Sequence, residues 1–418
     1  MFKILKKSKT DRARLGEIST NHGIFHTPVF MPPGTQATVK AVGPDDLNKI
    51  DVEIVLVNTL HLHLQPGENL INDLGGIHRF MGWSGPILSD SGGFQVWSFA
   101  KNRAKEGQKL AKINENGVEF SSPIDGLKHL ITPEKSIEIQ HKLGSDIIMA
   151  FDECSPDSDP PAKAYQLNSC IKKKKRSVNY KIHLDSIERQ WRAGNREYAK
   201  KSMERTHQWA ERSLNKHQEL SKKYISAGQK PPLIFGIIQG GIFEDLRKES
   251  AKFIINLPFD GIALGGETIG YNMPRTLEIL DYLQDLLPED KPRYTMGLGS
   301  SPNDIIEVVK RGVDMFDCVG PTRTARHGSL YSGEIFSKNG EINFESEFDK
   351  GCLRISNSRF EDDNNPIDKC CDCYTCQNFS RAYLHHLYSV KEPLYLRLAS
   401  IHNLRFIMRL IDIIRNNF

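Results

Sequence analysis

The sequence predicts an α/β fold of the (β/α)8 barrel type, the TIM barrel, because short apolar runs alternate with helical segments along the chain. A second observation is that each run ends in a glycine, an amide or a carboxylate, and in a parallel barrel such residues meet at one rim. The length of 418 residues fits one barrel with insertions. The eight runs are residues 29–31, 54–57, 86–88, 147–150, 233–238, 261–264, 294–296 and 315–316.

Start signals place helices between these runs. Thr132-Pro133-Glu134 predicts a helix that reaches Leu143, and Met273-Pro274 predicts one that reaches Leu287. Residues 156–195 look like an insertion after the fourth strand, and their lysine-rich run, 172–176, is interpreted as part of a solvated lobe in preference to an RNA-binding element. A long charged helix over 195–223 should follow.

The chain after the eighth run departs from the alternation. Residues 329–352 contain Asn339-Gly340 between alternating segments, which predicts a β-hairpin. We therefore expect a barrel over residues 1–328 and a separate subdomain with closing helices over 329–418.

Composition narrows the class of protein. The sequence is 39% hydrophobic but has no apolar run long enough to span a membrane, and its basic N-terminus lacks the apolar stretch of a secretory signal. The net charge of +4 does not by itself indicate a nucleic-acid partner. Crowded cysteines are typical of a metal site in a reducing compartment, so a cytoplasmic location is expected.

A metal site is predicted near the C-terminus. Cys371, Cys373 and Cys376 place three thiolates within one tight turn, so that they can converge on a tetrahedral ion. Cys370 is a competing first ligand, and the downstream candidates for the fourth are His385, His386 and His402. Three sulfurs and an imidazole suit zinc, and a closed site of this kind is structural.

The stretch around Asp317 is the strongest candidate for chemistry. The last apolar run ends in this carboxylate, and a loop with Arg323 and Arg326 follows at once. A barrel strand that positions a nucleophile or base, followed by cations for an anionic substrate, would have this pattern. The alternative for Asp317 taken alone is an ordinary turn aspartate.

Several long motifs resemble one family, the tRNA-guanine transglycosylases, also called queuine tRNA-ribosyltransferases. The resemblance covers almost the whole chain. The motifs are Leu88-Ser89-Asp90-Ser91-Gly92-Gly93-Phe94-Gln95, Phe151-Asp152-Glu153-Cys154, Gly236-Ile237-Ile238-Gln239-Gly240-Gly241, Pro292-Arg293-Tyr294-Thr295-Met296-Gly297, the Asp317 stretch and the three spaced cysteines.

This resemblance implies a TIM barrel with an inserted zinc subdomain that works as a homodimer and needs no nucleotide cofactor. The implied reaction exchanges the guanine at the tRNA wobble position for a 7-deazaguanine, either the aminomethyl base preQ1 or queuine. Asp317 would be the nucleophile that attacks the ribose, and Asp90 would be the acid/base. The family's zinc histidine lies 26 positions after the last cysteine, which selects His402.

The resemblance also implies a base pocket and a tRNA contact. Asp152 would accept hydrogen bonds from the donor edge of the base, and Gln239 with the Gly266 backbone would read its carbonyl. Phe94 and Met296 would sandwich the ring, and Asn58 would support Asp90. Arg323 and Arg326 would bind the anticodon.

The sequence departs from the family's usual pattern at Leu60, in the insertion and in the pocket loop 267–271. Because this loop borders the site for the substituent, either 7-deazaguanine could be the incoming base. The main functional alternative is a non-catalytic, zinc-containing partner subunit that binds tRNA, against which the presence of both Asp90 and Asp317 argues. A zinc-stabilised RNA-binding protein and a barrel glycoside hydrolase are more distant alternatives.

Overall fold

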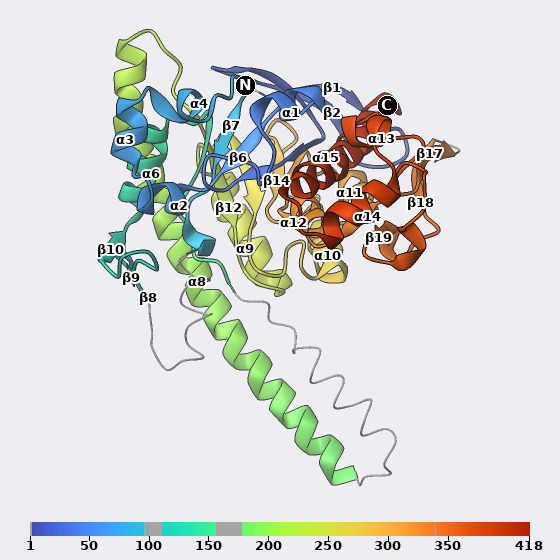
Figure 1. Cartoon of the computed structure of the whole chain (residues 1–418). Coiled ribbons are helices and arrows are strands. Elements are labelled where there is room, and N and C mark those ends of the chain that lie inside the picture. Colours follow the sequence, from blue (N-terminus) through green and yellow to red (C-terminus); the bar gives the residue numbers. More distant parts are fainter. Residues whose placement is uncertain (1, 96–97, 99–110, 156–177, 339) are drawn as a thin grey trace.

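The computed structural model describes residues 2–95, 98, 111–155, 178–338 and 340–418, with only the backbone for 178–194. One parallel sheet forms the barrel, with strands in the order β4-β15-β14-β13-β12-β11-β7-β6-β5. Because β4 and β5 are separated only by Pro32, the sheet closes on itself (Figure 1). The strands are β4 (Val29–Met31), β5 (Pro33–Gly34), β6 (Val55–Val57), β7 (Ile87–Ser89), β11 (Ile147–Met149), β12 (Leu233–Ile238), β13 (Gly261–Leu264), β14 (Arg293–Thr295) and β15 (Met315–Asp317).

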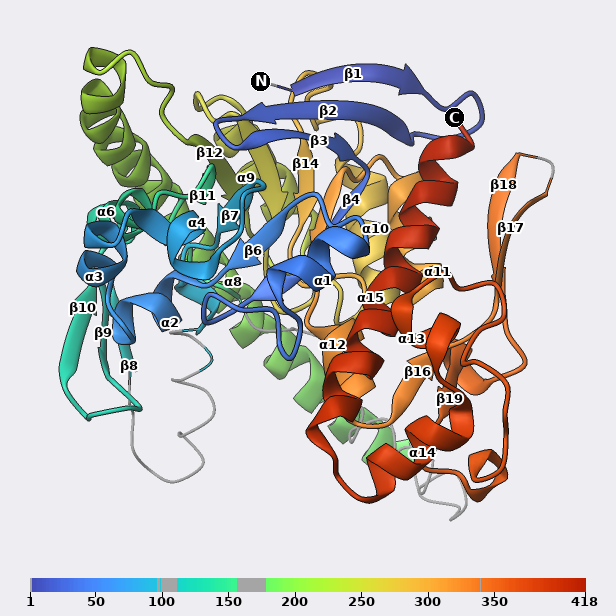
Figure 2. The ribbon, with the colours of Figure 1, turned by 45° about the horizontal axis from the view of Figure 1, so that its top comes forward.

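These strands coincide with the eight apolar runs, so the predicted barrel is confirmed; the first run and the glycine after it form the split pair β4 and β5. Helices surround the sheet, as Figures 1 and 2 show. They are α1 (Pro44–Lys49), α2 (Thr59–Leu64), α3 (Glu68–Asp73), α4 (Gly76–Met81), α6 (Pro133–Leu143), α8 (Val178–Ser226), α9 (Glu244–Ile255), α10 (Met273–Leu283), α11 (Pro302–Lys310) and α12 (Gly320–Arg326).

Two helices begin where their start signals predict. The Thr132 side chain accepts a hydrogen bond from the Lys135 N–H at the start of α6, and the Asn272 side chain does the same at α10. Helix α10 ends at Leu283 and not at Leu287: residues 284–286 form turns, in which the N–H groups of Leu286 and Leu287 both bond to the Leu283 carbonyl.

The helix predicted over 195–223 is longer than expected. Helix α8 begins at Val178, and it extends away from the barrel in Figure 1. Gly194 is the only glycine or proline between its ends, so nothing in the sequence stops the helix at residue 195. The second half of the expected lobe is therefore helical, and the lysine-rich run 172–176 lies outside the described residues.

Three antiparallel elements flank the barrel. The sheet of β1 (Phe2–Lys7), β2 (Arg14–Thr20) and β3 (Gly23–Thr27) packs Ile18 and Phe25 against the barrel's inner core, and it was not predicted. Strands β8 (Ala111–Asn114), β9 (Gly117–Ser121) and β10 (Lys128–Ile131) lie between β7 and α6, and they too were missed. The predicted hairpin is confirmed as β17 (Glu334–Lys338) and β18 (Glu341–Glu345).

The C-terminal segment returns to the barrel. It contains β16 (Ser329–Tyr331), β19 (Cys352–Arg354), two 3-10 turns (Asp349–Gly351 and Ser358–Phe360), α13 (Tyr374–Asn378), α14 (Arg381–Ser389) and α15 (Pro393–Asn416). Helix α15 packs against α11, α12 and β4 (Figure 2), which makes it the outer helix beside the first strand. A domain boundary at residue 328 stays a prediction. No helix in the described part of the chain is long and apolar enough to cross a membrane.

A buried ion pair joins the N-terminal sheet to the barrel. The guanidinium of Arg14 donates to both carboxylate oxygens of Asp314, at 2.9 and 2.6 Å, and the two side chains are 4% and 0% exposed. Asp314 also accepts the Arg293 backbone N–H at 2.6 Å.

We expect Asp314→Ala to lower the free energy of unfolding by about 3–5 kcal/mol, because it leaves the Arg14 charge buried and unpaired. Urea denaturation measures this change. The matched control is Lys7→Ala, which breaks the exposed pair of Lys7 with Glu289 and should cost less than about 1 kcal/mol. Equal losses for the two variants would contradict the assignment.

Candidate active site and metal centre

The predicted site residues follow the inward-facing positions of the barrel strands. Side chains alternate along each strand: Leu56, Leu88, Ile237, Tyr294 and Met315 pack in the inner cluster, whereas the residues between them face the helices. The residue two positions after each of these lies on the same face of its strand. These residues are Asn58, Asp90, Gln239, Met296 and Asp317. The carboxyl ends of the strands therefore direct these five side chains toward the barrel axis.

Asp317 ends β15 and is half-buried. Its Oδ1 accepts hydrogen bonds from the Tyr294 hydroxyl at 2.6 Å and from the Gly297 N–H at 3.0 Å. Burial raises the pKa of Asp317, and these two donors oppose the rise because they favour the charged form. Among the described residues, no donor binds Oδ2. One carboxylate oxygen is thus held in place while the other is available.

Asp90, which follows β7, is 7% exposed. Its Oδ2 accepts a hydrogen bond from the Asn58 amide at 2.5 Å, and its Oδ1 accepts the Thr59 and Gly92 N–H groups at 2.9 and 3.2 Å. Burial, together with the negative charges of Asp317 and Asp152, raises the pKa of Asp90 to about 7 despite these donors. A carboxyl with this pKa can both give and take a proton near neutral pH.

Asp152, which follows β11, lies in a different environment. The Ser91 hydroxyl donates to its Oδ1 at 2.9 Å, and the Gln239 amide donates to its Oδ2 at 2.8 Å. Burial raises the pKa of Asp152 to about 6, and the same two donors limit the rise. At neutral pH Asp152 is largely ionised, so it can accept hydrogen bonds from a ligand.

Gly265 and Gly266, after β13, allow close approach of the backbone to Gln239. A Cβ on Gly265 would lie 2.7 Å from the Gln239 Nε2, and one on Gly266, whose φ is +110°, would lie 3.2 Å from its Oε1. Gln239 is fully buried, and the second hydrogen of its amide remains available in addition to the bond to Asp152.

The remaining predicted residues differ in their surroundings. Met296 is half-buried against the inner cluster, and Phe94 is 47% exposed. Their role as a sandwich around a base stays a prediction. Arg323 and Arg326 lie on α12, directly after Asp317. In the described chain neither forms an ion pair with a carboxylate, and the Arg326 Nη1 is buried without a hydrogen-bond partner.

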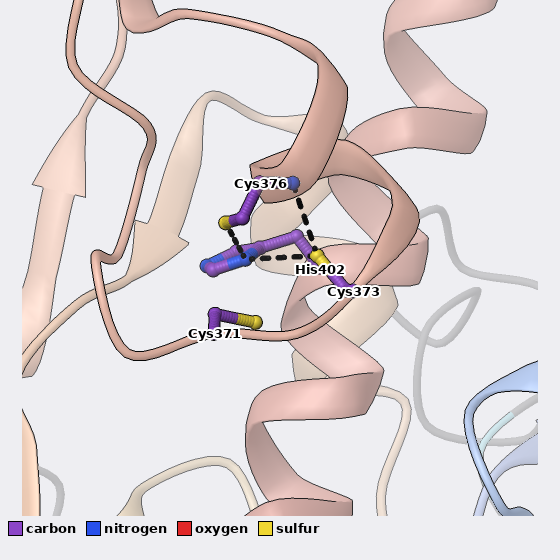
Figure 3. A group of neighbouring side chains, drawn as sticks. All are labelled: Cys371, Cys373, Cys376 and His402. Carbon is purple, nitrogen blue, oxygen red and sulfur yellow. Dashed lines mark hydrogen bonds between the residues drawn. The ribbon is translucent and has the colours of Figure 1, made fainter.

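The structure brings Cys371, Cys373, Cys376 and His402 into one buried group that could hold a metal ion (Figure 3). The four ligand atoms lie within 4.8 Å of one another, and the His402 Nδ1 is 3.2 Å from the Cys376 Sγ. The other ring nitrogen, Nε2, lies 2.7 Å from the Tyr331 carbonyl oxygen. This contact makes Nδ1 the ligand atom, since a carbonyl can only accept the proton that Nε2 carries.

The competing ligands lie elsewhere. Cys370 is exposed, and the His385 Nδ1 lies 2.7 Å from the Ile355 carbonyl oxygen. Neither belongs to the four-residue group, and His386 does not belong to it either.

Sequence reasoning did not assign roles to several residues that contact the carboxylates. They are Tyr294, which binds Asp317, Ser91, which binds Asp152, and Thr59, which binds Asp90. Tyr294 and Ser91 stand inside the quoted motifs, so their position was a usable signal. Nothing in the sequence indicates the backbone contact of Thr59, because it depends on how β6 and β7 are paired.

Comparisons with known proteins agree over the length of the chain. The family model "Queuine tRNA-ribosyltransferase" matches residues 9–182 and 181–418. The chain is 45% identical over 414 residues to the queuine tRNA-ribosyltransferase of Thermoanaerobacter sp. (strain X514), with 99% of this chain and 92% of the relative covered. The enzymes of the same name from Halothermothrix orenii and Staphylococcus aureus (strain JH9) are each 43% identical over 99% of this chain, with 92% and 91% of the relatives covered. The chain therefore belongs to the queuine tRNA-ribosyltransferase family.

Proposed function

We propose that the protein exchanges the wobble guanine of tRNA for a 7-deazaguanine through a covalent bond between Asp317 and the ribose. One observation carries this proposal: two buried carboxylates, Asp90 and Asp152, and the half-buried Asp317 stand at the carboxyl ends of barrel strands, and each has a different set of hydrogen-bond donors. Carboxylates in different environments can divide the roles of nucleophile, proton carrier and base reader.

Asp317 acts as the nucleophile. Replacing a base with retention requires two displacements at one face of the sugar, and a carboxylate is a competent nucleophile toward an oxocarbenium-like carbon. Tyr294 and Gly297 hold Oδ1, so Oδ2 attacks C1′ while the bond from C1′ to the guanine nitrogen breaks. In the second displacement the incoming base attacks C1′ and releases the Asp317 carboxylate.

Asp90 carries the proton. With a pKa near 7 it is partly protonated at neutral pH, so it can protonate the departing guanine. The resulting carboxylate then accepts the proton of the incoming base. Asn58 and the Thr59 N–H hold the side chain in one orientation between these two steps.

Asp152 and Gln239 read the base. The ionised Asp152 accepts hydrogen bonds from the donor edge, while the free hydrogen of the Gln239 amide and the Gly266 backbone bind the carbonyl. The incoming base is preQ1 or queuine. Arg323 and Arg326, without carboxylate partners in the described chain, bind the anticodon phosphates or bases.

The Cys3His group holds one structural zinc ion. Three thiolates and one imidazole match the preferred donors of a closed zinc site, and its burial beneath α15 fits a role in folding. The protein acts in the cytoplasm as a homodimer. Tyr374, on α13 beside the cysteines, and Tyr383, on α14, are exposed and are available for contact with a second subunit.

We expect the wild-type protein to exchange radiolabelled guanine into a tRNA whose anticodon begins with guanine, and Asp317→Asn to lose exchange by at least about 10³-fold. A chase with preQ1 or queuine then identifies the incoming base. Because the amide is close in size, the variant should fold. If the folded, zinc-loaded wild-type protein exchanged no base, the chain would instead be the non-catalytic tRNA-binding subunit.

Asp317→Asn should also lower the pKa of Asp90. The Asp317 charge disfavours ionisation of Asp90, so its removal stabilises the Asp90 carboxylate and moves the titration to lower pH. NMR of protein labelled with 13C at the aspartate carboxyl carbons measures this shift. Asp260→Asn, at the opposite end of β13, is the control and should leave the pKa of Asp90 unchanged. An unchanged or higher pKa in the Asp317 variant would count against coupling of the two carboxylates.

The purified protein should contain about one zinc per chain, measured by plasma mass spectrometry. Cys376→Ser should lose the metal and lower the melting temperature, because ion binding contributes to folding. Cys370→Ser is the matched control, since Cys370 is exposed and outside the group. Equal metal loss in both variants, or full zinc content in Cys376→Ser, would rule out the assigned ligand set.

A further inference from the structure

Helix α9 buries an arginine directly behind the base-reading residues. Arg247 is 0% exposed, its Nε donates to the Gly241 carbonyl at 2.7 Å, and its Nη1 donates to the Ile238 carbonyl at 2.9 Å. These two carbonyls bracket Gln239 in the loop after β12. The guanidinium therefore fixes the backbone on both sides of a residue that binds Asp152.

The same guanidinium reaches the second base-reading loop. Its Nη2 is buried and has no hydrogen-bond partner. A Cβ on Gly266 would lie 3.1 Å from this nitrogen and 3.2 Å from the Gln239 Oε1. Arg247 thus lies where the loops after β12 and β13 meet, behind both predicted base contacts.

The charge of Arg247 has no anionic partner in the described part of the chain. No carboxylate lies within ion-pair distance, and its neighbours Cys154 and Tyr282 are neutral because burial raises the pKa of both. Burial lowers the pKa of Arg247 to about 10, so it stays protonated at neutral pH. Burying this charge without an anionic partner is destabilising, so the two carbonyl contacts must hold the guanidinium in place.

We infer that Arg247 is a positioning residue for base recognition: it aligns the loops that carry Gln239 and Gly266. This inference rests on the proposed function and deepens it, since it concerns the same pocket.

The test compares two variants with a matched control in guanine exchange on the zinc-loaded full chain. Arg247→Met should raise the KM for guanine at least about tenfold with little change in kcat or in the KM for tRNA, which is a loss of about 1.4 kcal/mol in base binding. Arg247→Lys should also raise the KM for guanine, because a single ammonium cannot replace the fork of donors that binds the Gly241 and Ile238 carbonyls.

The control is Arg293→Met at the other end of the barrel. Arg293 is also buried, and its guanidinium also binds backbone carbonyls, those of Leu287 and Pro288. Its loss should reduce the melting temperature but leave the KM for guanine unchanged. The inference fails if Arg247→Met changes only the melting temperature, or if Arg293→Met raises the KM for guanine as much as Arg247→Met does. Exchange by the wild-type protein tests the proposed function separately.

Discussion

The alternation of side chains in a closed parallel barrel is the constraint on which the rest of the structure depends. Closure through the split pair β4 and β5 brings all the carboxyl ends of the strands to one rim. Because every second side chain faces the axis, a polar residue placed two positions after an inner apolar residue must also face it. Leu88 leads in this way to Asp90, and Met315 to Asp317. The strand period thus places Asp90 and Asp317, and neighbouring strands, loops and α2 supply their donors.

Hydrogen-bond donors and neighbouring charges give these carboxylates their chemical differences. Each would ionise readily in water, and desolvation raises the pKa of all three. What separates them is the local set of donors and neighbouring charges. Asp90 stands close to two other carboxylates and has a pKa near 7, whereas Asp152 is held by Ser91 and Gln239 and has a pKa near 6. Asp90 and Asp152 therefore differ in protonation at neutral pH within one pocket, as a proton carrier and a hydrogen-bond acceptor would need to.

The sequence predicted much of this arrangement because the barrel pattern and the motifs are local. The strand ends, the start of α6 and the four residues of the metal group could be located from spacing and resemblance alone. The start of α8 was not located, because the charged stretch before residue 195 was interpreted as part of a solvated lobe. The sheet β1–β3 and the strands β8–β10 were missed because their pairing is set by tertiary contact. Arg247 was missed for the same reason. Its role depends on contact with the loops after β12 and β13, which only the folded chain brings together.

The central claim is that Asp317 forms a covalent bond with the ribose of the tRNA. Mass spectrometry of the protein, quenched with acid during turnover and digested with nuclease and protease, tests it most directly. We predict a nucleotide remnant on the peptide that contains Asp317, and its loss when the reaction is chased with excess base before quenching. Turnover without any adduct, or an adduct on the peptide that contains Asp90, would contradict the account.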